Sequence, residues 1–342
     1  MAPESTDPLL GAIVLVLATA SVGTWLVLLS RIRRGPILPY EPRRPVPWHG
    51  VWTLLPIVLV AFTVFAAMRG DDSAEDAASA STSDLIERIT QGSMQQTAFV
   101  VAFLAVVIAV SGATRADLGL PEGVIQFVRD VRIGIITWLA SLVPVYVVQV
   151  LLISYFGTAE GHPLIQMIEQ HANPLLFALV FAAAVVVAPI CEELAFRLLL
   201  QGWLEKWEDR TLGWRDEKPN DEALPSDETL PNDEALITND EHPVTDDSTF
   251  DIRQSSFPTD QPPSTRLGGL PYGWLPIVLS SLLFALAHVG YGPDPVPLFL
   301  FALMLGYVYQ RTHRIVPSMV AHALFNGTSL FALWRVMSAG SP

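Results

Sequence analysis

The chain has 342 residues, of which 51% are hydrophobic and 16% charged, and its formal net charge is −14. An acidic chain lacks the basic surface that a nucleic-acid binder needs, and a single cysteine excludes a disulfide-stabilised scaffold. The charge is concentrated in one stretch, because residues 205–263 contain 17 acidic and five basic side chains, a net of −12, which leaves −2 for the remainder. That remainder is apolar and nearly neutral, which is typical of a membrane protein.

Long apolar runs recur along the chain. The first, residues 9–30, has no charged side chain and as a helix extends about 30 Å, enough to cross the hydrocarbon core of a bilayer. Glu4 and Asp7 precede it where a cleaved signal peptide would be positively charged, so we expect this helix to be retained. The other runs are residues 51–67, 97–113, 133–156, 174–190 continuing towards 204, 273–289, 297–310 and 316–336. They predict an all-α fold, a polytopic transmembrane helix bundle of about eight spans, in an integral, multi-pass protein of the cell (inner) membrane.

Arginines mark one side of the predicted bundle. They lie between the first and second spans, between the third and fourth, and between the seventh and eighth: Arg31, Arg33, Arg34, Arg43, Arg44, Arg115, Arg129, Arg132, Arg311 and Arg314. By the positive-inside rule this side is cytoplasmic, which places the amino terminus outside and the acidic stretch inside.

The chain is predicted to contain two groups of membrane helices and one insertion. Residues 1–172 form the amino-terminal membrane helices, and residues 173–335 form a second membrane domain that carries the polar motifs described below. Residues 205–267 interrupt this second domain with three copies of a six-residue acidic pattern, which begin at Asp221, Asp227 and Asp233. Proline and paired acids at this period cannot bury a face, so a disordered cytoplasmic loop is expected.

Ionisable residues inside the spans are the candidates for function, because they are costly in a membrane. His288 and His322 lie in apolar spans, and so does the acid pair Glu192-Glu193, which Arg197 follows. The other histidines lie in loops or flanks, where a solvated side chain is the ordinary interpretation: His49, His162, His171, His242 and His313. Aromatic residues near the span ends are expected to be interfacial anchors: Trp48, Trp52, Trp203, Tyr272, Trp274 and Trp334.

The spacing divides the two acids between different roles. Glu193 and Arg197 are separated by four residues and share one helical face, whereas Glu192 lies about 100° around the helix and is left without a local partner. An unpaired acid of this kind is suited to be a general base. Pro189, one turn before Glu193, can kink the span and admit water.

Two chemistries are open for these residues. His322 and Asn326 share a helical face, and a carboxylate, two histidines and an amide from three helices can meet at one depth. Glu192 and His288 can then hold and deprotonate a water while His322 and Asn326 donate to the oxyanion of an attacked amide. Alternatively, Glu192, His288 and His322 are ligands of a catalytic zinc with an open fourth position.

The motifs resemble those of the CAAX protease and bacteriocin-processing (CPBP, or Abi) family of intramembrane proteases, which includes the type II CAAX prenyl endopeptidases. Glu192-Glu193-Leu-Ala-Phe-Arg197 resembles the EExxxR motif of that family, Phe284-Ala-Leu-Ala-His288 its FxxxH motif, and His322-Ala-Leu-Phe-Asn326 its HxxxN motif. All three occur in the family's order. The resemblance covers residues 174–334 without the acidic insertion, less than half of the chain.

The resemblance implies an intramembrane endopeptidase that acts on membrane-associated protein or peptide substrates, such as CAAX-type carboxyl termini. Glu192 would activate the water beside His288, His322 and Asn326 would stabilise the oxyanion, and Glu193 with Arg197 would support the site. The family is often labelled as metalloproteases, although a glutamate-activated water needs no metal. The acidic insertion departs from the family pattern and puts the substrate and regulation in question.

Two other classes of function remain as alternatives. Buried Glu and His residues also build proton relays in proton-coupled transporters, but such proteins usually contain repeats between the two halves of the chain, and we detect none here. A non-catalytic membrane scaffold or immunity protein could keep the same motifs for structure alone.

Overall fold

The computed structural model describes residues 7–69, 81–157, 173–213, 266–267, 269–289 and 295–340. Within these ranges nearly all of the chain is helical, which confirms the all-α prediction. The separate helices are α1 (Pro8–Ile32), α2 (Leu54–Arg69) after the short turn η1 (Gly50–Thr53), α4 (Thr82–Ser111), α5 (Val124–Phe156), α10 (Trp274–Leu286), α11 (Pro295–Thr312) and α12 (Ile315–Gly340). One further long helix consists of five consecutive segments: α7 (Pro174–Ala182), η2 (Ala183–Val187), α8 (Ala188–Glu193), η3 (Leu194–Gln201) and α9 (Gly202–Thr211).

Five of these helices are long and apolar enough to cross a membrane. They are Pro8–Ile32, Thr82–Ser111, Val124–Phe156, Pro174–Thr211 and Ile315–Ser338. Two shorter apolar helices, Gly50–Phe65 and Trp274–Leu286, accompany them. The chain is therefore an integral membrane protein, and each predicted span coincides with a helix.

Local sequence signals set the helix ends. Asp7 caps α1 through the backbone N–H of Leu9, and Asn173 caps α7 in the same way, with a proline at the first helical position in both cases. Ser81 and Asp84 form a reciprocal capping box at the start of α4. Gly112 ends α4 in the left-handed conformation, with φ of 65°.

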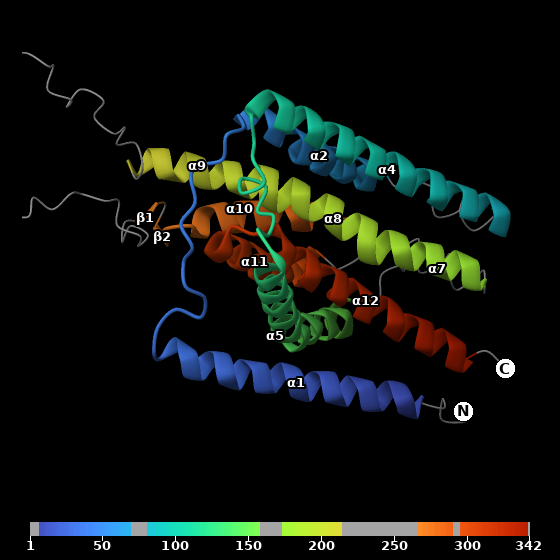
Figure 1. Cartoon of the computed structure of the whole chain (residues 1–342). Coiled ribbons are helices and arrows are strands. Elements are labelled where there is room, and N and C mark those ends of the chain that lie inside the picture. The colour runs from blue at the N-terminus through green and yellow to red at the C-terminus, as the bar shows by residue number, and fades with distance from the viewer. Residues whose placement is uncertain are drawn as a thin grey trace, which may run out of the picture.

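The helices pack around the long helix and α12. In Figure 1, α2 and α4 lie on one side of these two helices and α1 lies on the other. α5 packs against α12 and α1, and α10 packs against α11. α5 lies close to α12 at Gly134, where a Cβ atom would lie 2.7 Å from Cβ of Val320, so no larger residue fits without a shift.

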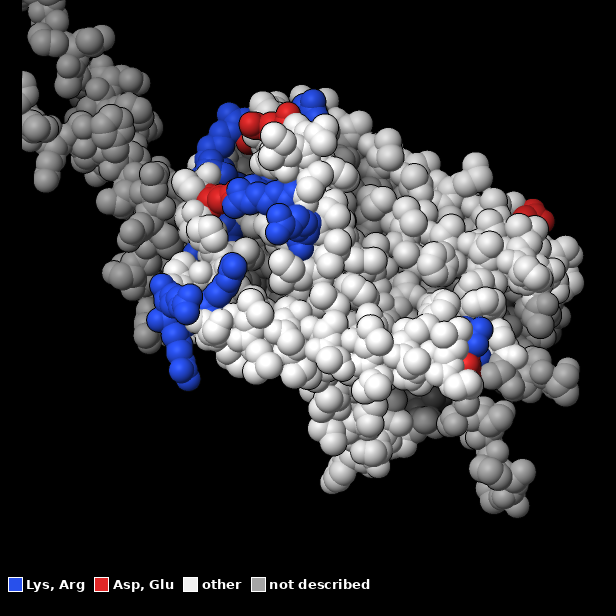
Figure 2. Space-filling model, turned by 60° about the horizontal axis from the view of Figure 1, so that its bottom comes forward, with Lys and Arg blue, Asp and Glu red and all other residues white. Residues whose placement is uncertain are grey.

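The loops that contain the arginines of the predicted cytoplasmic side lie at one end of this bundle. α1 and α9 both end on the side of the molecule opposite to the two chain termini (Figure 1). Contacts join the loops there: Arg43 pairs with Glu205 of α9, the N–H of Glu41 donates to the carbonyl oxygen of Arg311 at the end of α11, and Arg314 pairs with Asp130 of α5. In the space-filling view most of the visible Lys and Arg side chains gather at the end that carries α9 (Figure 2). The chain topology thus brings together the loops that the positive-inside rule assigns to one side of the membrane.

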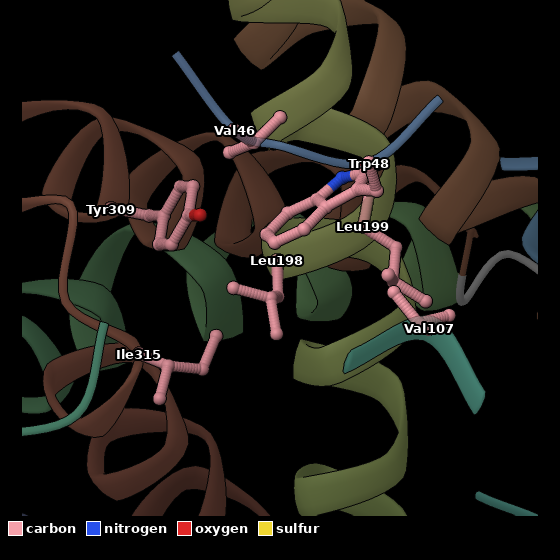
Figure 3. Close-up of a cluster of buried hydrophobic side chains, with 7 residues drawn as sticks. All are labelled: Val46, Trp48, Val107, Leu198, Leu199, Tyr309 and Ile315. Atoms are coloured by element: carbon pink, nitrogen blue, oxygen red, sulfur yellow. The ribbon is translucent and has the colours of Figure 1, made fainter. Parts of the chain in front are cut away.

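The segment between α1 and η1 crosses this end of the bundle. Residues 38–48, which we call the strap, join α1 to η1 and bury Val46 and Trp48 against Leu198 and Leu199 of η3 (Figure 3). The indole Nε1 of Trp48 donates to the carbonyl oxygen of Leu199 over 3.3 Å. Trp48 is fully buried. The prediction that it is an interfacial anchor was therefore wrong, because the strap folds inward instead of lying at the bundle surface.

The acidic insertion begins later than predicted. α9 continues to Thr211, and Glu205, Lys206 and Glu208 are buried within it, so the expected boundary at residue 205 is wrong by at least six residues. All three belong to the folded domain: Glu205 pairs with Arg43, Lys206 donates to the carbonyl oxygens of Val46 and Trp48, and Glu208 accepts from the N–H of Gly273. A short hairpin of two two-residue strands, β1 (Arg266–Leu267) and β2 (Leu270–Pro271), precedes α10. Residues 214–265, with the three acidic repeats, lie outside the described residues.

Candidate active site

The acid pair lies at the centre of an irregular helix. Glu192 and Glu193 end the α-helical segment α8, which lies between two π-helical segments, η2 and η3. π-helical turns are uncommon and are frequent at functional sites, because each one displaces the side chains that follow it and frees a backbone group. Both turns adjoin the motif that the sequence singled out.

Glu193 and Arg197 form a buried ion pair. Arg197 Nε lies 3.3 Å from Glu193 Oε2, and both side chains have no exposed surface. The guanidinium carbon of Arg197 also lies 5.4 Å from the centre of the Phe284 ring, which adds a cation–π contact. The expectation that these two residues share one helical face is confirmed.

His322 lies between the two carboxylates of the pair. Its Nδ1 is 2.9 Å from Glu193 Oε1, and its Nε2 is 3.7 Å from Glu192 Oε2. Glu193 is completely buried, whereas the Glu192 side chain keeps 25% of its surface exposed. Glu193 is therefore held by two basic partners, Arg197 and His322, whereas Glu192 is partly exposed and has Nε2 of the imidazole near it.

His288 approaches the same region from α10. Helix α10 ends at Leu286, so His288 lies in the following turn instead of in the span that was predicted to reach residue 289. The turn tightens because the N–H of His288 donates to Ala285, three residues earlier. Its Nδ1 is 2.8 Å from the carbonyl oxygen of Phe284, so an Nδ1–H tautomer leaves Nε2 as an acceptor.

The ring of Phe284 joins the two histidines. Its centre lies 4.9 Å from that of His288 and 5.6 Å from that of His322, and Phe284 itself is fully buried. The first and last residues of the FxxxH motif therefore contact one another as their spacing predicts. The phenylalanine also provides an apolar wall against which His322 and Arg197 pack.

Asn326 binds a backbone carbonyl that the π-helical turn leaves free. The N–H of Ala188 donates to Ala183, five residues back, instead of to Ala184. The next residue in this i→i+5 pattern is Pro189, which has no N–H. The side-chain amide of Asn326 donates to the Ala184 carbonyl over 2.8 Å and so replaces the missing partner. The second N–H of the amide remains available for another acceptor.

Metal binding would require the candidate ligands to lie closer together than they do in this structure. Among the described residues, no three His, Cys, Asp or Glu side chains lie in an arrangement that could hold a metal ion. Glu192, His288 and His322, the three residues that the zinc interpretation requires, do not meet this condition together, although His322 directs Nε2 towards Glu192.

An apolar cavity of about 390 Å³ adjoins the site. It lies between α1, the π-helical segment η2 and α12. Val185 and Gly327, the neighbours in sequence of Ala184 and Asn326, are among its lining residues. The lining residues do not include Glu192, His288, His322 or Asn326, so the cavity lies next to the helix segments that carry Ala184 and Asn326 and not at the acid pair itself.

Sequence reasoning missed a second set of buried polar residues. His313 was interpreted as a solvated flank residue, but it is 6% exposed and its Nε2 lies 3.3 Å from Glu205. Ser280 and Gln201 are completely buried and contact Arg197 directly or through one another. The available signal was the spacing of Glu193, Arg197, Gln201 and Glu205, which recur every four residues along one helix.

Comparison with known proteins gives one match. Residues 174–215 and 263–328 match the family model described as type II CAAX prenyl endopeptidase Rce1-like. The matched residues contain all three motifs and exclude α1, α2, α4, α5 and the strap. Neither a curated protein nor a solved structure matches the chain.

Proposed function

We propose that this chain is an intramembrane endopeptidase of the CAAX protease (CPBP) type that uses Glu192 as its general base. The match of residues 174–215 and 263–328 to the Rce1-like family model supports this proposal. The family match supports a protease that acts on a membrane-associated protein. The residue roles and the substrate are our proposal. The observation that carries it is the position of His322 between a buried carboxylate and a partly exposed one.

The arrangement of charged groups in the site supports a hydrolytic step. Arg197 offsets the charge of Glu193, and His322 lies between the two carboxylates with one ring nitrogen directed to each. With Nδ1–H directed to Glu193, an N–H at Nε2 of His322 is directed to the side on which Glu192 is partly exposed, because Nε2 lies 3.7 Å from Glu192 Oε2. A donor in this position, together with the free amide N–H of Asn326, is suited to stabilise an oxyanion.

The reaction then proceeds without a change in total charge. Glu192 takes a proton from a water that also hydrogen-bonds Nε2 of His288, and the hydroxide forms a bond to the carbonyl carbon of the peptide. The oxyanion develops beside His322 and Asn326 as the charge on Glu192 disappears. When the intermediate collapses, the carbon–nitrogen bond breaks, and Glu192 returns its proton to the leaving amine.

The proposed substrates are carboxyl-terminal segments of membrane-associated proteins, including CAAX-type termini. The apolar cavity supports this choice, because it lies between membrane helices and is lined in part by Gly327, the residue that follows Asn326. The proposed location is the cell (inner) membrane, with the site reached from the cytoplasmic side.

The test uses the purified full chain and a quenched fluorescent farnesyl-CAAX peptide. Glu192→Gln is expected to lower kcat by about 10²–10⁴-fold, the usual contribution of a general base. His288→Ala and His322→Ala are expected to abolish cleavage, and the matched control Glu87→Gln, an exposed acid on α4, is expected to leave it unchanged. A folded Glu192→Gln protein with full activity would refute the proposal.

Two further comparisons separate the alternatives. A strain that lacks the gene is complemented with the wild-type protein or with Glu192→Gln, and the membrane proteins of the two are compared for uncut precursors. If the protein is a scaffold or a transporter, no precursor accumulates with Glu192→Gln. Activity is also measured after exhaustive chelation. Full activity without metal would exclude the zinc interpretation, whereas loss and recovery with Zn²⁺ would replace the metal-free proposal.

A further inference from the structure

A buried polar stripe runs along the long helix, away from the proposed site. Glu193, Arg197, Gln201 and Glu205 follow one another at intervals of four residues, and none is more than 5% exposed. Only the first two belong to the recognised motif. Four consecutive buried polar residues on one face of a membrane helix are costly unless each has partners.

Hydrogen bonds link the stripe residue by residue. Arg197 Nη1 donates to Ser280 Oγ over 3.2 Å. The Ser280 hydroxyl has two acceptors at 3.2 Å, Gln201 Oε1 and the carbonyl oxygen of Ile277 in its own helix, and the first of these continues the path. Gln201 Nε2 then donates to Glu205 Oε1 over 3.0 Å and to the carbonyl oxygen of Gly306 over 2.8 Å. The path thus leads from the site through α10 and back to the long helix, and α11 supplies one acceptor.

The far end of the stripe is fixed by the strap. Arg43 Nη2 lies 2.9 Å from Glu205 Oε2, and Nζ of Lys206 donates to the carbonyl oxygens of Val46 and Trp48. Arg43, Val46 and Trp48 lie in the strap, outside the residues that match the family model. This part of the chain therefore holds the helix on which the acid pair lies.

The orientation of Arg197 depends on Ser280. Within the part of the chain that the structure describes, Nε and Nη2 of Arg197 make no hydrogen bond, and Nη1 makes one, to Ser280. The other contacts of the guanidinium are the ion pair with Glu193 and the ring of Phe284, which are less directional than a hydrogen bond.

We propose that Ser280 and Gln201 are positioning residues for the proposed hydrolysis: Gln201 orients the Ser280 hydroxyl, which orients Arg197 against Glu193 and thereby sets the position of His322. The inference rests on the proposed function. Neither residue touches the substrate, so their effect is expected on the chemical step and not on binding.

The experiment compares two adjacent buried serines. Ser280→Ala removes the hydroxyl that holds Arg197, whereas Ser281→Ala removes a buried hydroxyl that has no hydrogen-bond partner among the described residues. Ser280→Ala is expected to lower kcat about 10–100-fold, the usual effect of an outer partner, with KM within about twofold. Ser281→Ala is expected to leave both constants unchanged, and Ser280→Thr, which keeps a hydroxyl, is expected to recover most of kcat.

A double-mutant cycle covers the case in which threonine does not fit. Gln201→Met should reduce kcat by acting through Ser280, so Gln201→Met combined with Ser280→Ala should be no worse than Ser280→Ala alone. Additive losses, or equal kcat for Ser280→Ala and Ser281→Ala, would overturn the inference. Because Glu192→Gln is measured in parallel, a retained activity there would refute the proposed function instead.

Discussion

Asn326 has two distinct tasks in the proposed site. One N–H of its amide satisfies the Ala184 carbonyl, which lost its helical donor because Pro189 follows at the critical position. The other N–H is the proposed oxyanion donor. A loss of activity in Asn326→Ala would therefore be ambiguous by itself, because leaving a buried carbonyl unpaired costs about 1–3 kcal/mol.

The two tasks are separable with a second substitution. Pro189→Ala supplies an N–H at the position that the i→i+5 pattern requires, so it is expected to reduce the stability cost of Asn326→Ala. Activity is expected to fall about 10²–10³-fold with Asn326→Ala in both backgrounds, as for an oxyanion donor. Thermal unfolding in detergent and kcat are measured for the two single variants and the double variant.

The baseline for this comparison is Pro189→Ala alone, which controls for any change in the helix bend. If the double variant regains both stability and activity, Asn326 acts only on the backbone, and the oxyanion role falls to His322.

At the scale of elements, the strap and the neighbouring loop are held together by charge. Arg44 Nε donates to Asp117 Oδ1 over 2.6 Å, and the N–H and hydroxyl of Thr114 both donate to Asp117 Oδ2 over 2.7 Å. Burial by itself would raise the pKa of Asp117, but the hydrogen bonds from Arg44 and Thr114 outweigh it and lower the pKa to about 2. The ionised form is thus favoured in the folded protein.

This shift predicts how the stability depends on pH. The folded pKa is below the ordinary value of 3.8, so the contribution of Asp117 is complete above that value and is lost as the pH falls towards about 2. Asp117→Asn is expected to cost about 1–2 kcal/mol at neutral pH. The difference in Tm between wild type and variant should be constant from pH 8 to about 5 and should narrow below about 4.

Glu122→Gln is the matched control for this prediction, because Glu122 is an exposed acid in the same loop. Its difference from wild type should be small at every pH. A difference for Asp117→Asn that stays constant down to pH 3 would contradict the pKa shift as its cause.

The sequence predicts helices and motif faces better than it predicts partners across the bundle. The spans follow from hydrophobic length, and the contact of Glu193 with Arg197 follows from a four-residue spacing, so both are local properties. The burial of His313 and Trp48 depends on how the strap folds onto η3 and the α11–α12 turn, which no local pattern specifies. Apart from Pro189, nothing in the sequence indicates the π-helical turns.

For the whole molecule, contacts between α9 and the segment that enters α10 form a stem on either side of the insertion. The backbone N–H of Gly273 donates to Glu208 Oε2 over 2.9 Å, and the Tyr272 hydroxyl donates to Asp209 Oδ1 over 2.6 Å. Gly273 has φ of +81°, and a Cβ atom there would lie 2.4 Å from Nε2 of Gln310, so the chain turns into α10 at a position that glycine suits. α9 and α10 are thus joined before and after the insertion without its help.

Deletion of residues 217–247 is therefore expected to leave cleavage of the farnesyl-CAAX peptide within about twofold of wild type. Loop-closure entropy changes by only about 0.6 kcal/mol when a loop is halved, so the stem should form at least as readily. The matched variant is Asp209→Asn combined with Tyr272→Phe, which weakens the stem but keeps the insertion and should lower Tm. If the deletion variant folds with the Tm of wild type and yet loses activity, the acidic loop takes part in handling the substrate, and its net charge would then point to a basic sequence near the cleaved terminus.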